Sequence, residues 1–171
     1  MVENLEQKFF ERILRPGDVL VFNRGGLFGW AIRTKTYGRA SHVETYIGQG
    51  KTVGSRDGIG VNTFDLDPSG LVVVLRPSHF DVENACAWHK TVIGQRYDWL
   101  GLFWSFYAIR TGSDNHKMFC SEHATRFARQ GGFEPFSPET DADGVSPADF
   151  LRTPAYQWIW RAPGYASSSP S

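Results

Sequence analysis

Short turns between strand-like segments are the feature that most limits the folds open to this chain. Segments 41–47, 51–55, 60–64 and 70–76 are rich in β-branched and aromatic residues, and glycine-containing turns separate them. We expect these strands to form an antiparallel sheet. Together with a buried strand predicted at 18–22, the pattern favours a small antiparallel sheet built as a meander.

Helical patterns lie on both sides of this meander. Five segments have helical periodicity: residues 2–14, 27–37, 81–93, 98–109 and 119–130. In the first, Leu5, Phe9 and Ile13 form an apolar stripe. Asp81 is placed to cap the third, and Gly131 follows the last. The sequence therefore predicts an α+β fold.

The end of the chain contains two weaker signals. Ser146-Pro147-Ala148-Asp149 is typical of a helix start, and residues 154–160 are predicted to return to the sheet. At 171 residues we expect one domain over residues 1–162. We expect the helix at 2–14 to be an extension of that domain and residues 163–171 to be a flexible tail.

Composition excludes some functions. The 18 Lys and Arg residues balance 18 Asp and Glu residues, so we expect no nucleic-acid partner, because that binding depends on accumulated cationic contacts. The most apolar run, residues 99–109, is too short for a membrane span, so no integral membrane segment is expected. The charged N-terminus lacks an apolar signal region. We therefore expect a cytoplasmic protein, or one delivered by a phage or a secretion apparatus.

Cys120 is the candidate nucleophile. It opens the predicted helix at 119–130, where the positive end of the helix dipole favours a thiolate. The alternative is a structural role, since free cysteine is among the most buried residue types. Cys86, which lies mid-helix between two alanines, is assigned to the core for that reason.

His42 is the candidate base. Strand alternation places His42, Glu44 and Tyr46 on one face of segment 41–47. A cysteine nucleophile needs an imidazole to take its proton and a third polar group to orient that ring. Two residues along a strand span about 6.6 Å, which is a stretched hydrogen bond for Glu44. The alternative is that both side chains face water.

A metal-dependent site is a further alternative. His116, Cys120 and His123 could bind zinc from one helical face, although clustered ligands without a distant partner motif are a weak signal. That hypothesis predicts stoichiometric zinc and loss of activity with chelators. We prefer a site with no metal and no cofactor.

Four segments in order carry a family resemblance: residues 16–20 (PGDVL), 41–48 (SHVETYIG), 94–99 (GQRYDW) and 119–122 (FCSE). The chain resembles the circularly permuted branch of the NlpC-type papain-like cysteine hydrolases, which includes lecithin–retinol acyltransferase and its phospholipid-acting relatives. In the unpermuted enzymes the cysteine helix precedes the sheet, whereas here the histidine strand comes first. The resemblance spans about residues 15–151. It implies a permuted papain-like fold, a small sheet or half-barrel packed against helices, with the active cleft between the Cys120 helix and the His42 strand.

The resemblance also implies roles for individual residues. Cys120 would be the nucleophile, His42 the general base, and Tyr97 would lend its hydroxyl near the oxyanion. Relatives usually carry the orienting His or Glu about a dozen residues after the histidine, where this chain has Gly54. Glu44 is the preferred replacement, and Asp57 is the other option.

The implied activity is that of a cysteine amidase or peptidase acting through an acyl-enzyme thioester. Its substrate would be a peptidoglycan stem peptide or an N-acyl amino compound. An alternative is a lipid acyltransferase, phospholipase-type or thioesterase activity on the same fold. An alternative of another class is a non-catalytic binding or structural module that lost the orienting residue.

Overall fold

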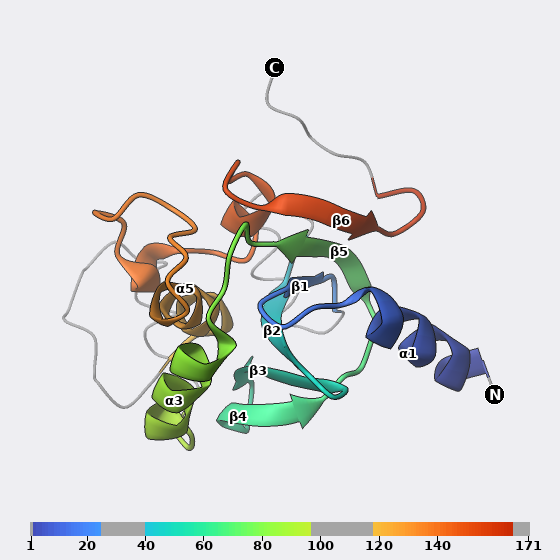
Figure 1. The fold of residues 1–171 in the computed structure, drawn as a ribbon, viewed down its shortest axis with the longest axis horizontal. Helices are drawn as coiled ribbons and strands as arrows, with labels where there is room; N and C mark the ends of the chain where they lie inside the picture. The colour runs from blue at the N-terminus through green and yellow to red at the C-terminus, as the bar shows by residue number, and fades with distance from the viewer. Residues whose placement is uncertain (1, 25–39, 97–117, 166–171) are drawn as a thin grey trace.

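The computed structural model describes residues 2–24, 40–96 and 118–165 (Figure 1). Its helices are α1 (Val2–Ile13), α3 (Val82–Val92) and α5 (Cys120–Gln130), with short 3-10 turns at Ala142–Gly144 and Asp149–Leu151. Its strands are β1 (Val19–Phe22), β2 (His42–Gly48), β3 (Lys51–Arg56), β4 (Gly60–Asp65), β5 (Leu71–Arg76) and β6 (Gln157–Arg161). The helices predicted at 27–37 and 98–109 lie outside the described residues.

The strands form one six-stranded antiparallel sheet in the order β4-β3-β2-β1-β5-β6. The predicted antiparallel sheet and α+β class are confirmed. The predicted continuous meander is wrong after β4, because β5 pairs with β1 instead. All four residues of β1 are buried, and an apolar strand of this kind is stabilised by a neighbour on each edge, which β2 and β5 provide.

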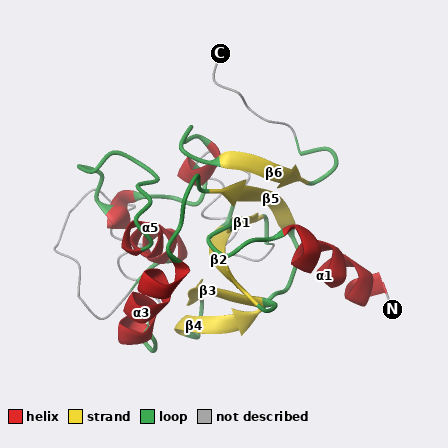
Figure 2. Cartoon of the chain, in the orientation of Figure 1, coloured by secondary structure: helices red, strands yellow, loops and turns green. Residues whose placement is uncertain are grey.

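Helices α3 and α5 pack together on one side of the sheet, where α5 contacts β2 and β3, while α1 lies on the other side (Figure 2). On α5 the buried face contains Cys120, Ala124, Phe127 and Ala128, as the periodicity predicts. Asp81 caps α3 by accepting a hydrogen bond of 3.1 Å from the backbone N–H of Asn84. These contacts place the start of α5 near β2 and β3.

The apolar stripe predicted on α1 is wrong in its register. Leu5 and Phe9 are 68% and 47% exposed, whereas Phe10 and Leu14 are buried. The Phe10 ring makes an edge-on contact with Trp160 of β6, with centroids 4.9 Å apart. Trp160 is distant in sequence, so the local pattern of α1 could not indicate which face it would cover.

The predicted helix after Ser146 is only a 3-10 turn, in which Asp149 accepts hydrogen bonds from the backbone and hydroxyl of Ser146.

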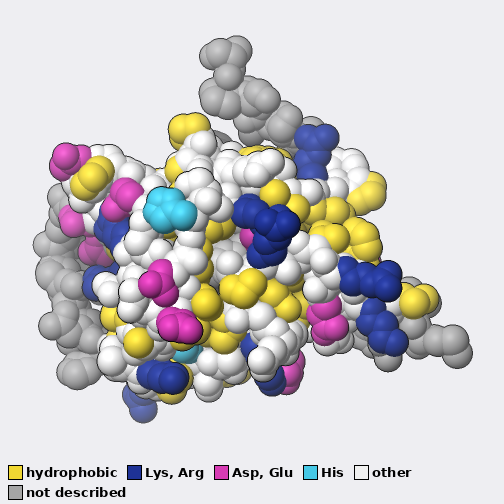
Figure 3. All heavy atoms as spheres, in the orientation of Figure 1, with side chains coloured by type: hydrophobic (Ala, Val, Ile, Leu, Met, Phe, Trp, Pro, Cys, Tyr) yellow, Lys and Arg dark blue, Asp and Glu magenta, His cyan; other side chains and the backbone are white. Residues whose placement is uncertain are grey.

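Figure 3 shows basic and acidic side chains interspersed over one face of the molecule, in keeping with the zero net charge. Within the described ranges, no helix is long and apolar enough to cross a membrane.

Candidate active site

Cys120 is the first residue of α5, and hydrogen bonds on both sides of it fix its position. The hydroxyl of Ser55 on β3 donates to the carbonyl oxygen of Met118 at 2.7 Å. The hydroxyl of Ser121 donates to the carbonyl oxygen of Val145 at 2.6 Å. The helix start is therefore held between the sheet and the segment that follows α5.

The side chains of Cys120 and His42 are hydrogen-bonded to each other. Burial lowers the pKa of His42. The charge and hydrogen bond of the Cys120 thiolate raise it, Glu44 adds a smaller effect of the same kind, and the net result is a pKa of about 9. An interaction that stabilises the imidazolium beside a thiolate stabilises the thiolate equally. The contacts with Cys120 and Glu44 therefore favour the protonated form of His42.

Glu44 completes this arrangement. Its Oε1 lies 2.8 Å from Nε2 of His42, so the side chains converge and the stretched geometry expected from the strand spacing does not occur. Glu44 is only 1% exposed, so the alternative in which both residues face water is wrong. Burial raises the pKa of Glu44, but hydrogen bonds from His42 and Arg56 and their charges hold it well below its usual value.

Gly54 explains how Glu44 can occupy this position. It lies on β3 beside Glu44, and a Cβ added to Gly54 would lie 3.0 Å from the Cγ of Glu44. The position where the resemblance expects an orienting side chain thus has none, and the side chain of Glu44 fills the space. Asp57, the other option, lies exposed in the turn between β3 and β4.

Two residues contact Glu44 that the sequence alone does not place beside it. The hydroxyl of Thr52 donates to Glu44 Oε2 at 2.7 Å, and Arg56 donates to Oε1 at 2.6 Å and to Oε2 at 3.0 Å. Thr52, Gly54 and Arg56 alternate along β3 and therefore share one face. That alternation was the available signal, but only the strand pairing places it beside Glu44.

His123, considered above as a metal ligand, is buried and lies in a chain of polar groups that reaches the surface at Thr63. Its Nε2 is 3.0 Å from Nδ1 of His89, whose Nε2 is 3.2 Å from the Thr63 hydroxyl. Burial lowers the pKa of His123 to about 3 and that of His89 to about 4, so both rings are neutral near neutral pH. In the part of the chain described, no three His, Cys, Asp or Glu residues are grouped to hold a metal ion. His116 lies outside the described residues.

Tyr97 also lies outside the described residues, so its predicted place near the oxyanion stays a prediction. Cys86, assigned to the core, is partly buried and packs against the apolar cluster of Val53, Ala85 and Phe127. Burial raises the pKa of the Cys86 thiol, and the charge of Lys90 partly opposes this. The two cysteines therefore differ in environment.

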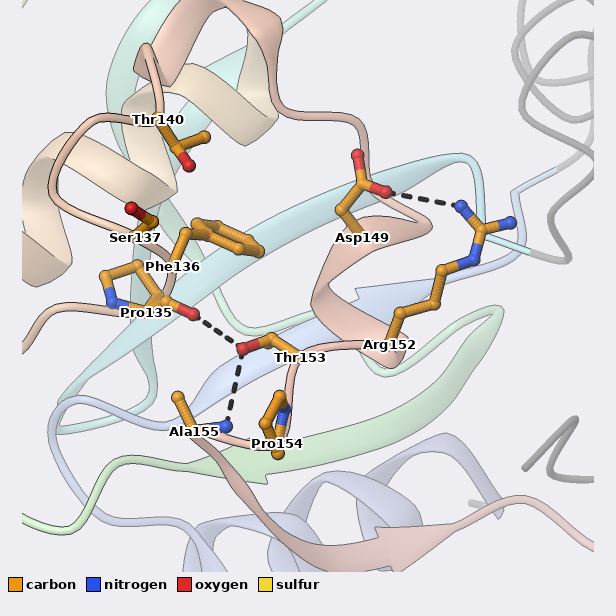
Figure 4. Close-up of a pocket in the computed structure, with 9 residues that line it drawn as sticks. All are labelled: Pro135, Phe136, Ser137, Thr140, Asp149, Arg152, Thr153, Pro154 and Ala155. Atoms are coloured by element: carbon orange, nitrogen blue, oxygen red, sulfur yellow. Dashed lines mark hydrogen bonds and ion pairs between the residues drawn. The ribbon is translucent and has the colours of Figure 1, made fainter. Parts of the chain in front are cut away.

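A surface pocket of about 610 Å³ lies apart from these residues, between segments 135–140 and 149–155 (Figure 4). Two of the polar side chains that line it, Thr153 and Arg152, contact other parts of the lining. Thr153 donates to the carbonyl oxygen of Pro135 at 2.6 Å, and Arg152 contacts Asp149 at 3.2 Å (Figure 4). Its lining contains no Cys120, His42 or Glu44, so the chemistry described above does not belong to it.

No family model matches this sequence, and no curated protein matches it. Among solved structures, the chain is similar to the crystal structure of the metalloprotein yiiX from Escherichia coli O157:H7 (DUF1105). The TM-score is 0.64 at 17% sequence identity, and the match covers 88% of this chain and 98% of that chain. At this identity the likeness concerns the fold, a mixed α+β architecture with an antiparallel sheet.

Proposed function

We propose that this protein is a cysteine amidase or peptidase of the circularly permuted NlpC-type, papain-like group. The observation that carries the proposal is the contact of His42 with both Cys120 and Glu44, which raises the pKa of the imidazole to about 9. In chain order the histidine strand β2 precedes the cysteine helix α5, as in the permuted branch. The active cleft would lie between these two elements.

The reaction follows from the arrangement of these groups. The Cys120 thiolate attacks the carbonyl carbon of an amide, and the N–H groups at the start of α5 stabilise the negative oxygen. The His42 imidazolium gives its proton to the leaving amine as the C–N bond breaks, which leaves a thioester on Cys120. Water then attacks the thioester, neutral His42 takes the proton of that water, and the acid leaves as the thiolate forms again. Glu44 keeps the ring oriented and its charge compensated in both steps.

The substrate class follows from the resemblance rather than from the contacts. A peptidoglycan stem peptide or an N-acyl amino compound is the first choice, and a lipid or thioester acyl group is the second. All of them pass through the same acyl-enzyme. The non-catalytic alternative rests on Gly54 leaving the imidazole unoriented, whereas the contact of Glu44 with His42 supports the catalytic proposal.

The test is the pH dependence of iodoacetamide alkylation, read by peptide mass for Cys120 and Cys86 separately. A free thiol titrates near ~8.5. We expect Cys120 to react rapidly near pH 6.5 and Cys86 to react slowly, since burial raises the pKa of the Cys86 thiol. His42→Ala should slow the reaction of Cys120 and leave that of Cys86 unchanged.

Two outcomes would contradict the proposal. If Cys120 reacts like an ordinary thiol both in the wild type and in His42→Ala, no catalytic pair exists. If the purified protein holds stoichiometric zinc and chelators abolish turnover, the metal-dependent alternative is correct. The structural neighbour is described as a metalloprotein, and that description would suit this alternative.

A further inference from the structure

We propose that Arg56 is a positioning residue of this site: by clamping both carboxylate oxygens of Glu44 it fixes the group that orients His42. The inference rests on the proposed function, since it takes Cys120 and His42 as the reacting pair. It adds Arg56 to the site that Cys120, His42 and Glu44 form.

The hydrogen-bond capacity of Glu44 is filled. Oε1 contacts Nε of Arg56 at 2.6 Å and Nε2 of His42 at 2.8 Å. Oε2 accepts from the Thr52 hydroxyl at 2.7 Å and from Nη2 of Arg56 at 3.0 Å. Each carboxylate oxygen offers two lone pairs, so these four contacts satisfy the group. Any rotation of the carboxylate would break at least one charged hydrogen bond, and so the orientation of Oε1 toward His42 is fixed.

The charge of Arg56 is needed because the carboxylate is buried. With the thiolate and imidazolium formed, the site holds two negative groups, Cys120 and Glu44, and one positive group, His42. The Arg56 guanidinium brings the sum to zero. An uncompensated charge in a buried site is costly, and a carboxylate in that situation becomes protonated or moves toward water. Either change would remove the negative charge that supports the imidazolium.

Arg56 is itself held in place. Its Cζ lies 3.9 Å from the centroid of the Phe64 ring on β4, a cation–π contact, and its side chain is only 22% exposed. Two of its three nitrogens are used by Glu44. This geometry suits a fixed clamp better than a group that reads a substrate carboxylate, because a substrate would have to compete with Glu44.

The experiment measures Cys120 alkylation near pH 6.5 in the wild type, Arg56→Met, Arg56→Lys, Glu44→Gln and the Arg56→Met/Glu44→Gln double variant. We expect Arg56→Met to lower the rate about tenfold or more, the loss that follows when charged hydrogen bonds to a buried carboxylate are removed. Arg56→Lys should recover only part of it, because lysine keeps the charge without the planar fork. In the Glu44→Gln background, Arg56→Met should change the rate less than about twofold, because coupled residues are not additive.

Arg76→Met is the matched control. Arg76 clamps the buried carboxylate of Asp18 in the same way, at 2.8 and 2.7 Å, but Asp18 lies at the opposite end of β1 from the residue that pairs with His42. Its loss should lower the melting temperature without changing the alkylation rate of Cys120.

The results separate the two proposals. If His42→Ala slows Cys120 but Arg56→Met does not, or Arg56→Lys reacts as fast as the wild type, the clamp is wrong and the proposed function stands. An equal effect of Arg56→Met with and without Glu44 would also overturn the clamp. If His42→Ala has no effect, both proposals fail.

Discussion

Replacing Cys120 by alanine should lower the pKa of His42. Burial lowers that pKa, while the Cys120 thiolate and then Glu44 raise it, with a net change from 6.5 to about 9. Alanine keeps the burial of the ring and its 2.8 Å contact with Glu44 but removes the thiolate. The substitution therefore isolates the contribution of the sulfur to the charge state of the imidazole.

The magnitude follows from the same interaction. The net rise in the pKa corresponds to roughly 3 kcal/mol at about 1.36 kcal/mol per pKa unit. An opposite charge in close contact shifts a pKa by ~1–3 units. Because Glu44 remains, we expect the pKa of His42 in Cys120→Ala to fall by about 2 units, which is the middle of that range.

The assay is an NMR titration of the imidazole carbons in histidine-labelled protein. The chain has 5 histidines, and the His42→Ala spectrum identifies the resonance of interest. Cys86→Ala is the matched control, because Cys86 packs against the cluster of Val53, Ala85 and Phe127 and should leave the titration of His42 unchanged. An identical midpoint in Cys120→Ala and the wild type would refute the thiolate–imidazolium pair.

Two further predictions concern the surroundings of the site. Gly54→Ala should displace Glu44, whose Cγ would lie 3.0 Å from the new Cβ, and so cost about 1–3 kcal/mol of unfolding free energy in urea titrations; Gly144→Ala, with nothing within 4 Å, should change it little. Equal effects of the two substitutions would contradict the crowding. The pKa values of His89 and His123 are lowered to about 4 and about 3, which implies stability that is present above pH 6.5 and is lost as the pH falls toward those values. His123→Phe should therefore reduce the slope of unfolding free energy against pH by up to about 1.4 kcal/mol per pH unit, and an unchanged slope would show that His123 does not stay neutral.

Local patterns in the sequence were sufficient for most of the elements. The strands near β2, β3, β4 and β5 and the helices α3 and α5 follow from side-chain periodicity and from glycine turns, which act over a few residues. The same local signals place Cys120 at a helix start and His42 on a strand. They also place Glu44 on the same face as His42, which is the geometry that a period of two requires.

The remaining features could not be predicted locally, because they depend on contacts between residues distant in sequence. Whether Leu5 and Phe9 or Phe10 and Leu14 would be buried on α1 depended on Trp160, a residue of β6. The position of β1 between β2 and β5 likewise depends on distant contacts, because a fully buried strand needs a hydrogen-bonded neighbour on each edge.

For the site, the residue types alone indicate which side chains could react, since a thiol, an imidazole and a carboxylate each have a characteristic chemistry. It did not determine that Glu44 would be buried and saturated with donors. That required β3 to pair with β2, so that Gly54 leaves space beside Glu44 and Arg56 reaches its oxygens. A buried charge is stable only when its partners surround it, and the pairing of distant strands brings those partners together.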